Sequence, residues 1–319
     1  MTAGGSTGSG SAAALLAPYR EAMTAPGAAA LAAALLDEAL AHCGCERGAG
    51  WHARQSTTAA VFGVHVSPAD ADVAERLTVA RYIALFLLVE DGPPEAARAL
   101  AHRIRADPGT TGTGTGYSDG CGDGEPARQL RLLLEDYRDR ALPTGRLTAL
   151  IAEFCAAVAE ESAGPPPPGQ LPARRAETIG TRPNIECWRL LRGLPLPPPG
   201  SPDHPLPEAT VEATYLANDL FSAAVEERAG GSFAAGNTVL ARARATGDRA
   251  GAVEAAVTRY NALVAALAAA RHRPLPALLG ALVDGNRTGH LALAGVRYPG
   301  LPLDVFDRLH VVGPAGRDR

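Results

Sequence analysis

Three polar residues, Asn218, Ser222 and Glu226, recur at every fourth position of a segment that is otherwise rich in Ala, Leu and Val. On an α-helix, residues with this spacing stay within about 80° of one face. Their amide oxygen, hydroxyl and carboxylate form a hard-oxygen ligand set that suits Mg²⁺. We expect Val211 and Tyr215 on the same side. The spacing thus predicts a polar rim above an apolar pocket, and a solvated helix stripe is the alternative.

A second group of chemically useful residues stands where another helix must end. Residues 74–91 favour a helix, and the Gly-Pro-Pro stretch that follows stops it. Within this run Tyr82, Phe86 and Glu90 share one face, which places two aromatic rings beneath a carboxylate. Glu90 and Asp91 put negative charge at the unfavourable end of the helix dipole, so a cation, either a metal or an arginine, should offset it.

The stretch at 218–226, Asn-Asp-Leu-Phe-Ser-Ala-Ala-Val-Glu, resembles the second metal motif of bacterial class I terpene synthases, N-D-x-x-S-x-x-x-E. Residues 90–95, Glu-Asp-Gly-Pro-Pro-Glu, resemble the first, aspartate-rich motif of that family, with Glu in first place. The resemblance implies two sets of metal ligands, which are Glu90, Asp91 and Glu95 in the first motif and Asn218, Ser222 and Glu226 in the second.

An arginine-bearing segment lies between the two acidic motifs. Residues 171–180, Leu-Pro-Ala-Arg-Arg-Ala-Glu-Thr-Ile-Gly, resemble the family pattern Y-L-x-x-R-R-x-T-x-G. In the family an arginine here senses the diphosphate, and the backbone after it bends into the pocket. Anchoring the pattern on Thr178 and Gly180 favours Arg175, while Arg174 stays eligible.

Two further matches follow in the family's order. Residues 236–239, Gly-Asn-Thr-Val, resemble the N-x-V entry into the next helix, and residues 285–298 resemble the closing G-N…R-Y segment. Arg297 can donate a bidentate fork to a phosphate, and Tyr298 can donate a hydroxyl. By resemblance, Asp91 should pair with the sensing arginine when diphosphate binds.

The resemblance covers roughly residues 51–299 and implies an all-α fold, the class I terpene synthase bundle of helices around a central cavity. It also implies a lyase that uses three Mg²⁺ ions to ionise a linear prenyl diphosphate, cyclises the carbocation to a terpene hydrocarbon or alcohol, and releases pyrophosphate. A dry pocket with aromatic faces would protect the cation. The expected cavity residues are Tyr82, Phe86, Thr178, Gly180, Trp188 and Tyr215.

Two other functions stay open. Glu90 replaces the family's Asp, and Val225 stands where a basic residue is common, so a protein that binds a prenyl diphosphate without turnover is an alternative. A prenyltransferase would carry two aspartate-rich motifs and several lysines, whereas this chain has no lysine. The motifs do not distinguish geranyl, farnesyl and geranylgeranyl diphosphates.

Composition limits the other classes of protein to which the chain could belong. With a net charge of −4 and no basic strip, the chain of 319 residues is not expected to bind nucleic acid. No apolar run is long enough for a membrane span, and residues 1–11 lack the charged start of a secretory signal. The five cysteines, an odd number without zinc-site spacing, indicate reduced thiols and a cytoplasmic protein.

We expect one domain over residues 12–312, between tails at 1–11 and 313–319, with a flexible Gly/Thr-rich insert at 107–126. Antiparallel dimers are usual in the resembled family, so a homodimer is allowed. An irregular stretch is expected after Trp51. The other predicted helices cover 12–41 with a break near 26–27, 94–106, 127–142, 146–162, 185–193, 207 or 208 to about 230, 238–245 and 248–271.

Overall fold

The computed structural model describes residues 12–41, 48–106, 124–164, 166–230, 235–298 and 302–313, and throughout these ranges the regular elements are helices. The predicted tail at 1–11 and most of the predicted insert at 107–126 lie outside the described residues. The elements are α1 (Ala12–Leu16), η1 (Ala17–Tyr19), α2 (Ala28–Ala41), α3 (Ala49–His65), α4 (Val73–Glu90), α5 (Pro94–Ala106), α6 (Gly124–Asp139), α7 (Gly145–Glu161), η2 (Pro168–Gln170), α8 (Leu171–Thr178), α9 (Thr181–Leu191), α10 (Leu206–Ala229), α12 (Thr238–Thr246), α13 (Arg249–Ala270), α14 (Pro274–Ala292) and α15 (Leu303–Arg308).

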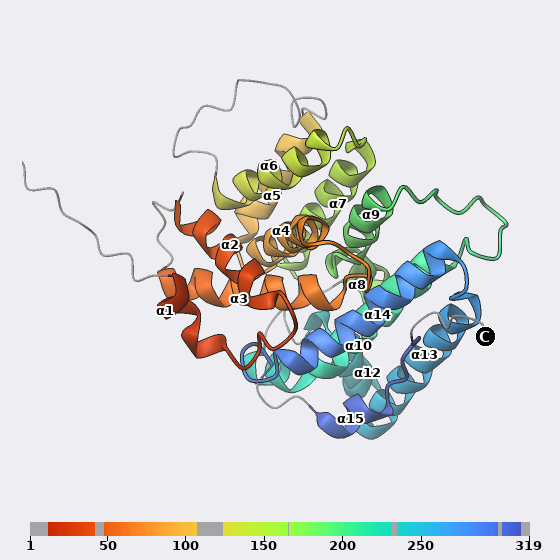
Figure 1. Ribbon diagram of the computed structural model, residues 1–319. Coiled ribbons are helices and arrows are strands. Elements are labelled where there is room, and N and C mark those ends of the chain that lie inside the picture. The colour runs from red at the N-terminus through yellow and green to blue at the C-terminus, as the bar shows by residue number, and fades with distance from the viewer. Residues whose placement is uncertain are drawn as a thin grey trace, which may run out of the picture.

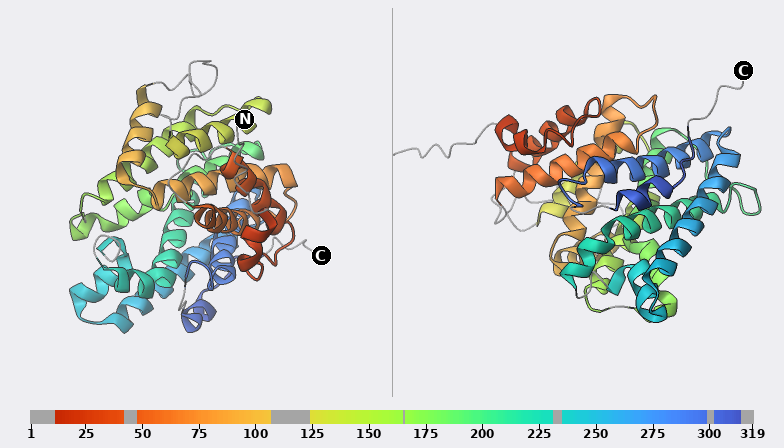
Figure 2. Two further views of the ribbon diagram at one scale, coloured as in Figure 1. Left: turned by 90° about the vertical axis from the view of Figure 1, so that its left-hand side faces the viewer. Right: turned by 90° about the horizontal axis from the view of Figure 1, so that it is seen from below.

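The helices pack around α4, which crosses the middle of the molecule between α5–α7 on one side and α10, α13 and α14 on the other (Figure 1). α3 packs against α2, α4 and α14, and α10 packs against α9, α13 and α14. Figure 2 shows the same bundle from two further sides, with the C-terminal helices in blue beside α10. Among the described helices, none is both long and apolar enough to cross a bilayer.

One core joins these helices. Its largest fully buried side chains include Tyr82 on α4, Tyr137 on α6, Trp188 on α9, Phe221 on α10 and Tyr260 on α13. Because α4, α9 and α10 also contact one another or a shared neighbour, residues far apart in sequence meet at the centre of the bundle.

The sequence explains where α4 begins and ends. Asp72 accepts a hydrogen bond from the backbone N–H of Glu75, and the Glu75 carboxylate accepts one from the backbone N–H of Asp72, which forms a capping box. The helix ends at Glu90, directly before Asp91 and the Gly-Pro-Pro stretch, as predicted. α10 likewise confirms the predicted helix around the Asn/Ser/Glu triad, with bounds that differ by one or two residues.

The irregular stretch predicted after Trp51 was wrong, because Trp51 lies within α3. This segment contains Thr57 and Thr58, which are poor helix formers. Each threonine hydroxyl donates to the carbonyl four residues earlier, which gives the hydroxyl a partner within the helix. Packing of α3 against α2, α4 and α14 then outweighs its weak intrinsic propensity.

Two predicted helix starts were too late. α6 begins at Gly124, so residues 124–126, which were assigned to the insert, are helical. α9 begins at Thr181 rather than Ile185, directly after the left-handed Gly180. In both cases a glycine with positive φ lies at the start, and such residues mark a change of chain direction that hydrophobic periodicity does not reveal.

Candidate active site

A small cavity of about 70 Å³ lies between α3, α4, α9, α10 and α14. Its walls combine aromatic and aliphatic side chains with amide, acidic and guanidinium groups. The lining residues are Phe62, Val66, Tyr82, Ile83, Phe86, Leu87, Glu90, Ile179, Gly180, Thr181, Asn184, Thr214, Asn218, Asn286, His290, Arg297 and Tyr298. The predicted site residues among them are Tyr82, Phe86, Glu90, Gly180, Asn218, Arg297 and Tyr298.

The bend between α8 and α9 forms one wall of this cavity and requires a glycine. Gly180 has a φ of +67°, and a Cβ atom there would lie 2.4 Å from the Phe86 ring. The Tyr82 hydroxyl donates to the Gly180 carbonyl at 2.5 Å, and Phe86 stacks on Phe154 with ring centroids 5.2 Å apart. The aromatic face of α4 thus holds the bend in place.

Arg297 offsets the negative charge at the end of α4. Its Nη1 lies 2.7 Å from Asp91 Oδ2 and its Nη2 lies 2.9 Å from Glu90 Oε2. Gln55 on α3 donates a further hydrogen bond to Asp91 Oδ2 at 2.6 Å. The pairing of Asp91 with Arg175, which the resemblance implies for the diphosphate-bound protein, is not present in this structure.

The two carboxylates respond differently to this environment. Burial raises the pKa of Glu90 to about 7, although Arg297 opposes that rise, and Asp91 adds to it. Burial would also raise the pKa of Asp91, but the charge and hydrogen bonds of Arg297, together with the hydrogen bond from Gln55, hold it below its ordinary value. Glu90 is therefore the carboxylate that a further cation would stabilise most.

The triad on α10 faces toward α8 and α12. The Asn218 amide oxygen accepts from Arg175 Nη2 at 2.7 Å. Ser222 Oγ donates to the Asn218 carbonyl at 2.7 Å, and Glu226 Oε2 accepts from the amide of Asn237 at 2.7 Å. Burial raises the pKa of Glu226 despite the opposing charge of Arg175.

Arg175 is held by Asp219, which follows Asn218 in the Asn/Ser/Glu motif. Asp219 was not among the predicted site residues. Arg175 Nε donates to Asp219 Oδ1 at 2.8 Å, and Asp219 is fully buried. Asp219 Oδ2 also accepts from the backbone N–H and the hydroxyl of Thr238, at 2.8 and 2.6 Å. Asp219 thus ties α8, α10 and the start of α12 together, and Arg175 lies 3.4 Å from the Thr178 hydroxyl.

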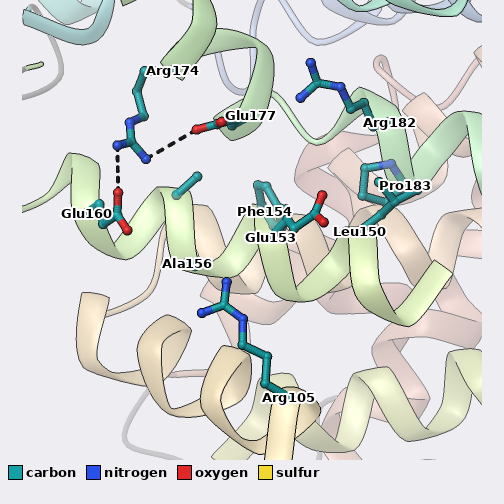
Figure 3. A pocket seen from close by; sticks show the side chains of 11 residues that line it. Arg105, Leu150, Glu153, Phe154, Ala156, Glu160, Arg174, Glu177, Arg182 and Pro183 are labelled. Carbon is teal, nitrogen blue, oxygen red and sulfur yellow. Dashed lines mark hydrogen bonds and ion pairs between the residues drawn. The ribbon is translucent and has the colours of Figure 1, made fainter. Parts of the chain in front are cut away.

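Arg174 lies in a different place. It lines a surface cleft of about 320 Å³ between α5, α7, α8 and α9 (Figure 3). Its guanidinium pairs with Glu160 at 2.6 Å and with Glu177 at 3.4 Å. Of the two arginines that the sequence left eligible, only Arg175 contacts the Asn/Ser/Glu motif.

The placement of Tyr215 in the cavity was wrong. Tyr215 lines a separate groove with Leu171 and Ala252, while Thr214 lines the central cavity. The reason is helical phase, because residue 214 lies one four-residue step before Asn218 and residue 215 does not.

Seven other predicted residues are absent from the lining, namely Asp91, Glu95, Arg175, Thr178, Trp188, Ser222 and Glu226. Trp188 is fully buried in the core, Thr178 is buried beside Arg175, and Glu95 is exposed near the start of α5.

Sequence reasoning missed a histidine in the cavity wall. His290 is 1% exposed, and its ring lies beside Phe62, Phe221 and Tyr298, with centroid distances of 5.1, 5.1 and 4.5 Å. Burial lowers the pKa of His290 to about 4, although the hydrogen bond to the Asn286 carbonyl opposes this. The available signal was its place within the G-N…R-Y segment, four residues after Asn286.

The residues around the cavity fit a divalent cation in their chemistry. Within the described ranges, no three His, Cys, Asp or Glu side chains form a ready metal-binding group. Glu90 and Glu226 nevertheless each have a raised pKa, and the charge of Glu226 contributes to the rise at Glu90. Added positive charge between them, with the oxygen of Asn218 nearby, would relieve this repulsion.

Comparisons with known proteins locate the fold. The sequence matches no protein-family model and no curated protein. Among solved structures, a linalool/nerolidol synthase from Streptomyces clavuligerus is similar, with 17% identity over 83% of this chain and 96% of the other, and a TM-score of 0.65. The same synthase in complex with 2-fluorogeranyl diphosphate gives 17% identity, coverage of 83% and 99%, and a TM-score of 0.63.

Hedycaryol synthase in complex with nerolidol is also similar, with 20% identity over 83% of this chain and 94% of the other, and a TM-score of 0.60. The protein therefore has the all-α fold of the class I terpene synthases, as the sequence predicted. Its structural relatives of this kind are bacterial terpene synthases.

Proposed function

We propose that the protein is a terpene synthase that uses Mg²⁺ to ionise a linear prenyl diphosphate and cyclises the resulting carbocation, releasing pyrophosphate. One observation carries the proposal. Glu90, Asn218 and Arg297, from three separate sequence motifs, line the same cavity as the aromatic rings of Tyr82 and Phe86. A solvated helix stripe would not bring these groups to one shared cavity.

The proposed diphosphate end of the cavity has several donors. Arg297 and Tyr298 line the cavity, and Arg175 contacts Asn218, which also lines it. A guanidinium can donate two parallel hydrogen bonds to phosphate oxygens. Because the carboxylates of Asp91 and Asp219 already orient the two arginines, little side-chain ordering remains when a diphosphate binds.

Mg²⁺, when bound, supplies positive charge that stabilises pyrophosphate as a leaving group. The proposed ligands are the residues of the two acidic motifs, Glu90, Asp91, Glu95, Asn218, Ser222 and Glu226. The arginines stabilise the same developing charge from fixed positions, and electrostatic stabilisation of this kind is usually the largest contribution to catalysis.

The other walls suit a carbocation. The faces of Phe62, Tyr82 and Phe86 present negative π-electron density, which attracts a cation. Ile83, Leu87 and other aliphatic side chains keep water from the reacting carbon. Cyclisation would require the cavity, about 70 Å³ in this structure, to widen around the prenyl chain.

The test compares two neighbouring carboxylates on α10. Glu226→Gln keeps the size of the side chain but removes its charge, and should lower the rate of pyrophosphate release by orders of magnitude. Glu227→Gln is the matched control, because Glu227 is exposed and pairs with Arg249 on the surface. Equal activity of both variants and the wild type would contradict the proposed site.

A second candidate is a protein that binds a prenyl diphosphate without turnover. The observation that favours it is that Arg297 already forms ion pairs with both Glu90 and Asp91, the first two carboxylates of the first metal motif. The two functions differ in one result, since only the synthase converts the prenyl diphosphate into a volatile terpene and free pyrophosphate.

A further inference from the structure

His290 occupies a position in the cavity wall that packing alone does not require. Its imidazole is enclosed by Phe62, Phe221 and Tyr298, and an apolar ring would fill the same space. Both ring nitrogens nevertheless have polar partners. Nδ1 lies 2.7 Å from the Asn286 carbonyl, and Nε2 lies 3.3 Å from the amide nitrogen of Asn218.

These contacts determine which nitrogen carries the proton. A carbonyl oxygen only accepts hydrogen bonds, so Nδ1 of His290 must be the protonated nitrogen that donates to Asn286. In the neutral ring, Nε2 then has a free lone pair, which accepts from the Asn218 amide. The imidazole is therefore fixed between a backbone acceptor on its own helix and a side-chain donor on α10.

The contact with Arg175 determines the orientation of the Asn218 amide. Arg175 Nη2 can only donate, and it lies 2.7 Å from Asn218 Oδ1. The oxygen of this amide therefore faces Arg175, and the nitrogen faces His290. A continuous series of hydrogen bonds runs from Arg175 on α8, through Asn218 on α10, to His290 on α14.

We propose that His290 is a positioning residue, whose Nε2 holds the amide of Asn218 so that its oxygen stays directed at the diphosphate and metal side of the cavity. The inference rests on the proposed function, because it concerns how a proposed ligand is oriented. Arg175 alone would not secure this orientation if its guanidinium moved toward a bound diphosphate. His290 would continue to hold the amide nitrogen.

Removing the acceptor has a definite consequence. Without Nε2, the Asn218 amide nitrogen would lose the acceptor that His290 provides, and a phenylalanine ring in its place has no acceptor atom in its plane. An amide in such a place rotates to find another partner, and its oxygen leaves the ligand position. Loss of a residue that orients a ligand typically weakens metal binding by about ten- to a hundredfold.

The first measurement is binding of inorganic pyrophosphate in the presence of Mg²⁺, followed by calorimetry. We expect His290→Phe, which keeps a planar ring, to raise the Kd about ten- to a hundredfold. His290→Gln, whose amide oxygen can accept from Asn218, should recover part of this loss. The control is His65→Phe. His65 contacts Thr288 on α14, the helix that also carries His290, but His65 lines a separate groove.

The outcomes separate the inference from the function on which it rests. If the wild type binds and His290→Phe binds equally well, the positioning role is wrong while the proposed function stands. If the wild type does not bind Mg²⁺ and pyrophosphate at all, both are wrong. A Kd that rises equally for His290→Phe and His65→Phe would show a general packing effect and would also contradict the positioning role.

A second measurement observes the ring of His290 directly in the wild-type protein, and it needs only one folded variant to assign the signal. Long-range ¹H–¹⁵N correlation spectra of the wild-type protein identify the protonated nitrogen of each histidine ring, and the His290 signal is the one that His290→Gln or His290→Phe lacks. We expect a neutral ring with the proton on Nδ1. A proton on Nε2, which could not then accept from Asn218, would overturn the inference.

Discussion

At the scale of single residues, Glu90 has an unusual carboxylate. Its side chain is half-buried and shares Arg297 with Asp91, and Asp91 accepts two of the three hydrogen bonds that this arginine donates to the pair. Burial therefore dominates at Glu90, and its pKa rises from 4.5 to about 7. Arg297 stabilises the negative charge of Glu90 only in part, so binding of another cation would stabilise it further.

This shift predicts how stability depends on pH. The unfolded chain releases the Glu90 proton near pH 4.5, whereas the folded protein keeps it until about pH 7. The stabilising contribution is thus fully present below pH 4.5 and is lost as pH rises through about 7. Glu90→Gln has no proton to lose, so its Tm relative to the wild type should increase by about one to a few degrees between pH 5 and pH 8.

Calorimetry of both proteins without Mg²⁺ or diphosphate would measure this difference. A Tm difference that stays constant over this range, or that falls as pH rises, would contradict the raised pKa of Glu90.

A double-mutant cycle tests which arginine Asp91 uses. Without diphosphate, the stability losses of Asp91→Asn and Arg297→Gln should be non-additive, by about 0.5–3 kcal/mol, because both changes break one ion pair. The losses of Asp91→Asn and Arg175→Gln should add to within about 0.5 kcal/mol. Urea denaturation provides these values.

The opposite pattern, with coupling to Arg175 and additivity with Arg297, would contradict the arrangement described above. In turnover assays, the coupling of Asp91 to Arg175 that the sequence predicts for the diphosphate-bound protein stays a prediction.

The sequence pointed to residues at this scale where spacing along one helix was enough, or where a family motif supplied them, as for Gly180, Arg297 and Tyr298. Phe86 and Glu90 lie on the cavity side of α4 because four-residue spacing alone defines that face. Tyr215 failed because its phase on α10 is one residue away from the correct line. His290 was missed because its partner Asn218 is on another helix, and contacts between helices depend on packing.

At the scale of helices, one buried carboxylate connects three elements. Asp219 accepts hydrogen bonds from Arg175 on α8 and from Thr238 at the start of α12, while it lies on α10 itself. The N-x-V motif contributes here as well, since Asn237 caps α12 and contacts Glu226. The motif residues thus set the relative positions of helices as well as the chemistry.

This arrangement predicts a large loss of stability for Asp219→Asn. Removing one partner of a buried ion pair leaves the other charge uncompensated, which typically costs about 3–5 kcal/mol. The control is Glu227→Gln, because the Glu227–Arg249 pair is about half exposed and should contribute less than about 1 kcal/mol. A loss below about 1 kcal/mol for Asp219→Asn, measured by urea denaturation, would contradict its anchoring role.

Helix ends with clear chemical signals were predicted well, and ends without them were not. The Gly-Pro-Pro stretch predicted the end of α4 and the start of α5. α3 was missed because its buried polar face, which includes Gln55 and Thr57, has no apolar periodicity. Tertiary packing against α2, α4 and α14 compensates for its weak helix propensity.

At the scale of the whole molecule, helical composition and the order of the motifs were enough to predict the fold. Residues 107–123 lie between α5 and α6 in the sequence and include few residues that could join the core. We expect deletion of residues 110–120 to change activity and Tm little, because loop-closure entropy varies slowly with length. The control is a deletion extended through Pro126, which would remove the first turn of α6 and should lower the Tm.

The central claim is that this cavity converts a prenyl diphosphate, and the direct test uses the wild-type protein. Purified protein is incubated separately with geranyl, farnesyl and geranylgeranyl diphosphates, with Mg²⁺ or with EDTA, and volatile products and pyrophosphate are measured. We predict a terpene product and pyrophosphate from at least one substrate with Mg²⁺, and neither with EDTA. No product from any substrate with Mg²⁺, despite binding of a prenyl diphosphate, would contradict the synthase and favour the binding protein.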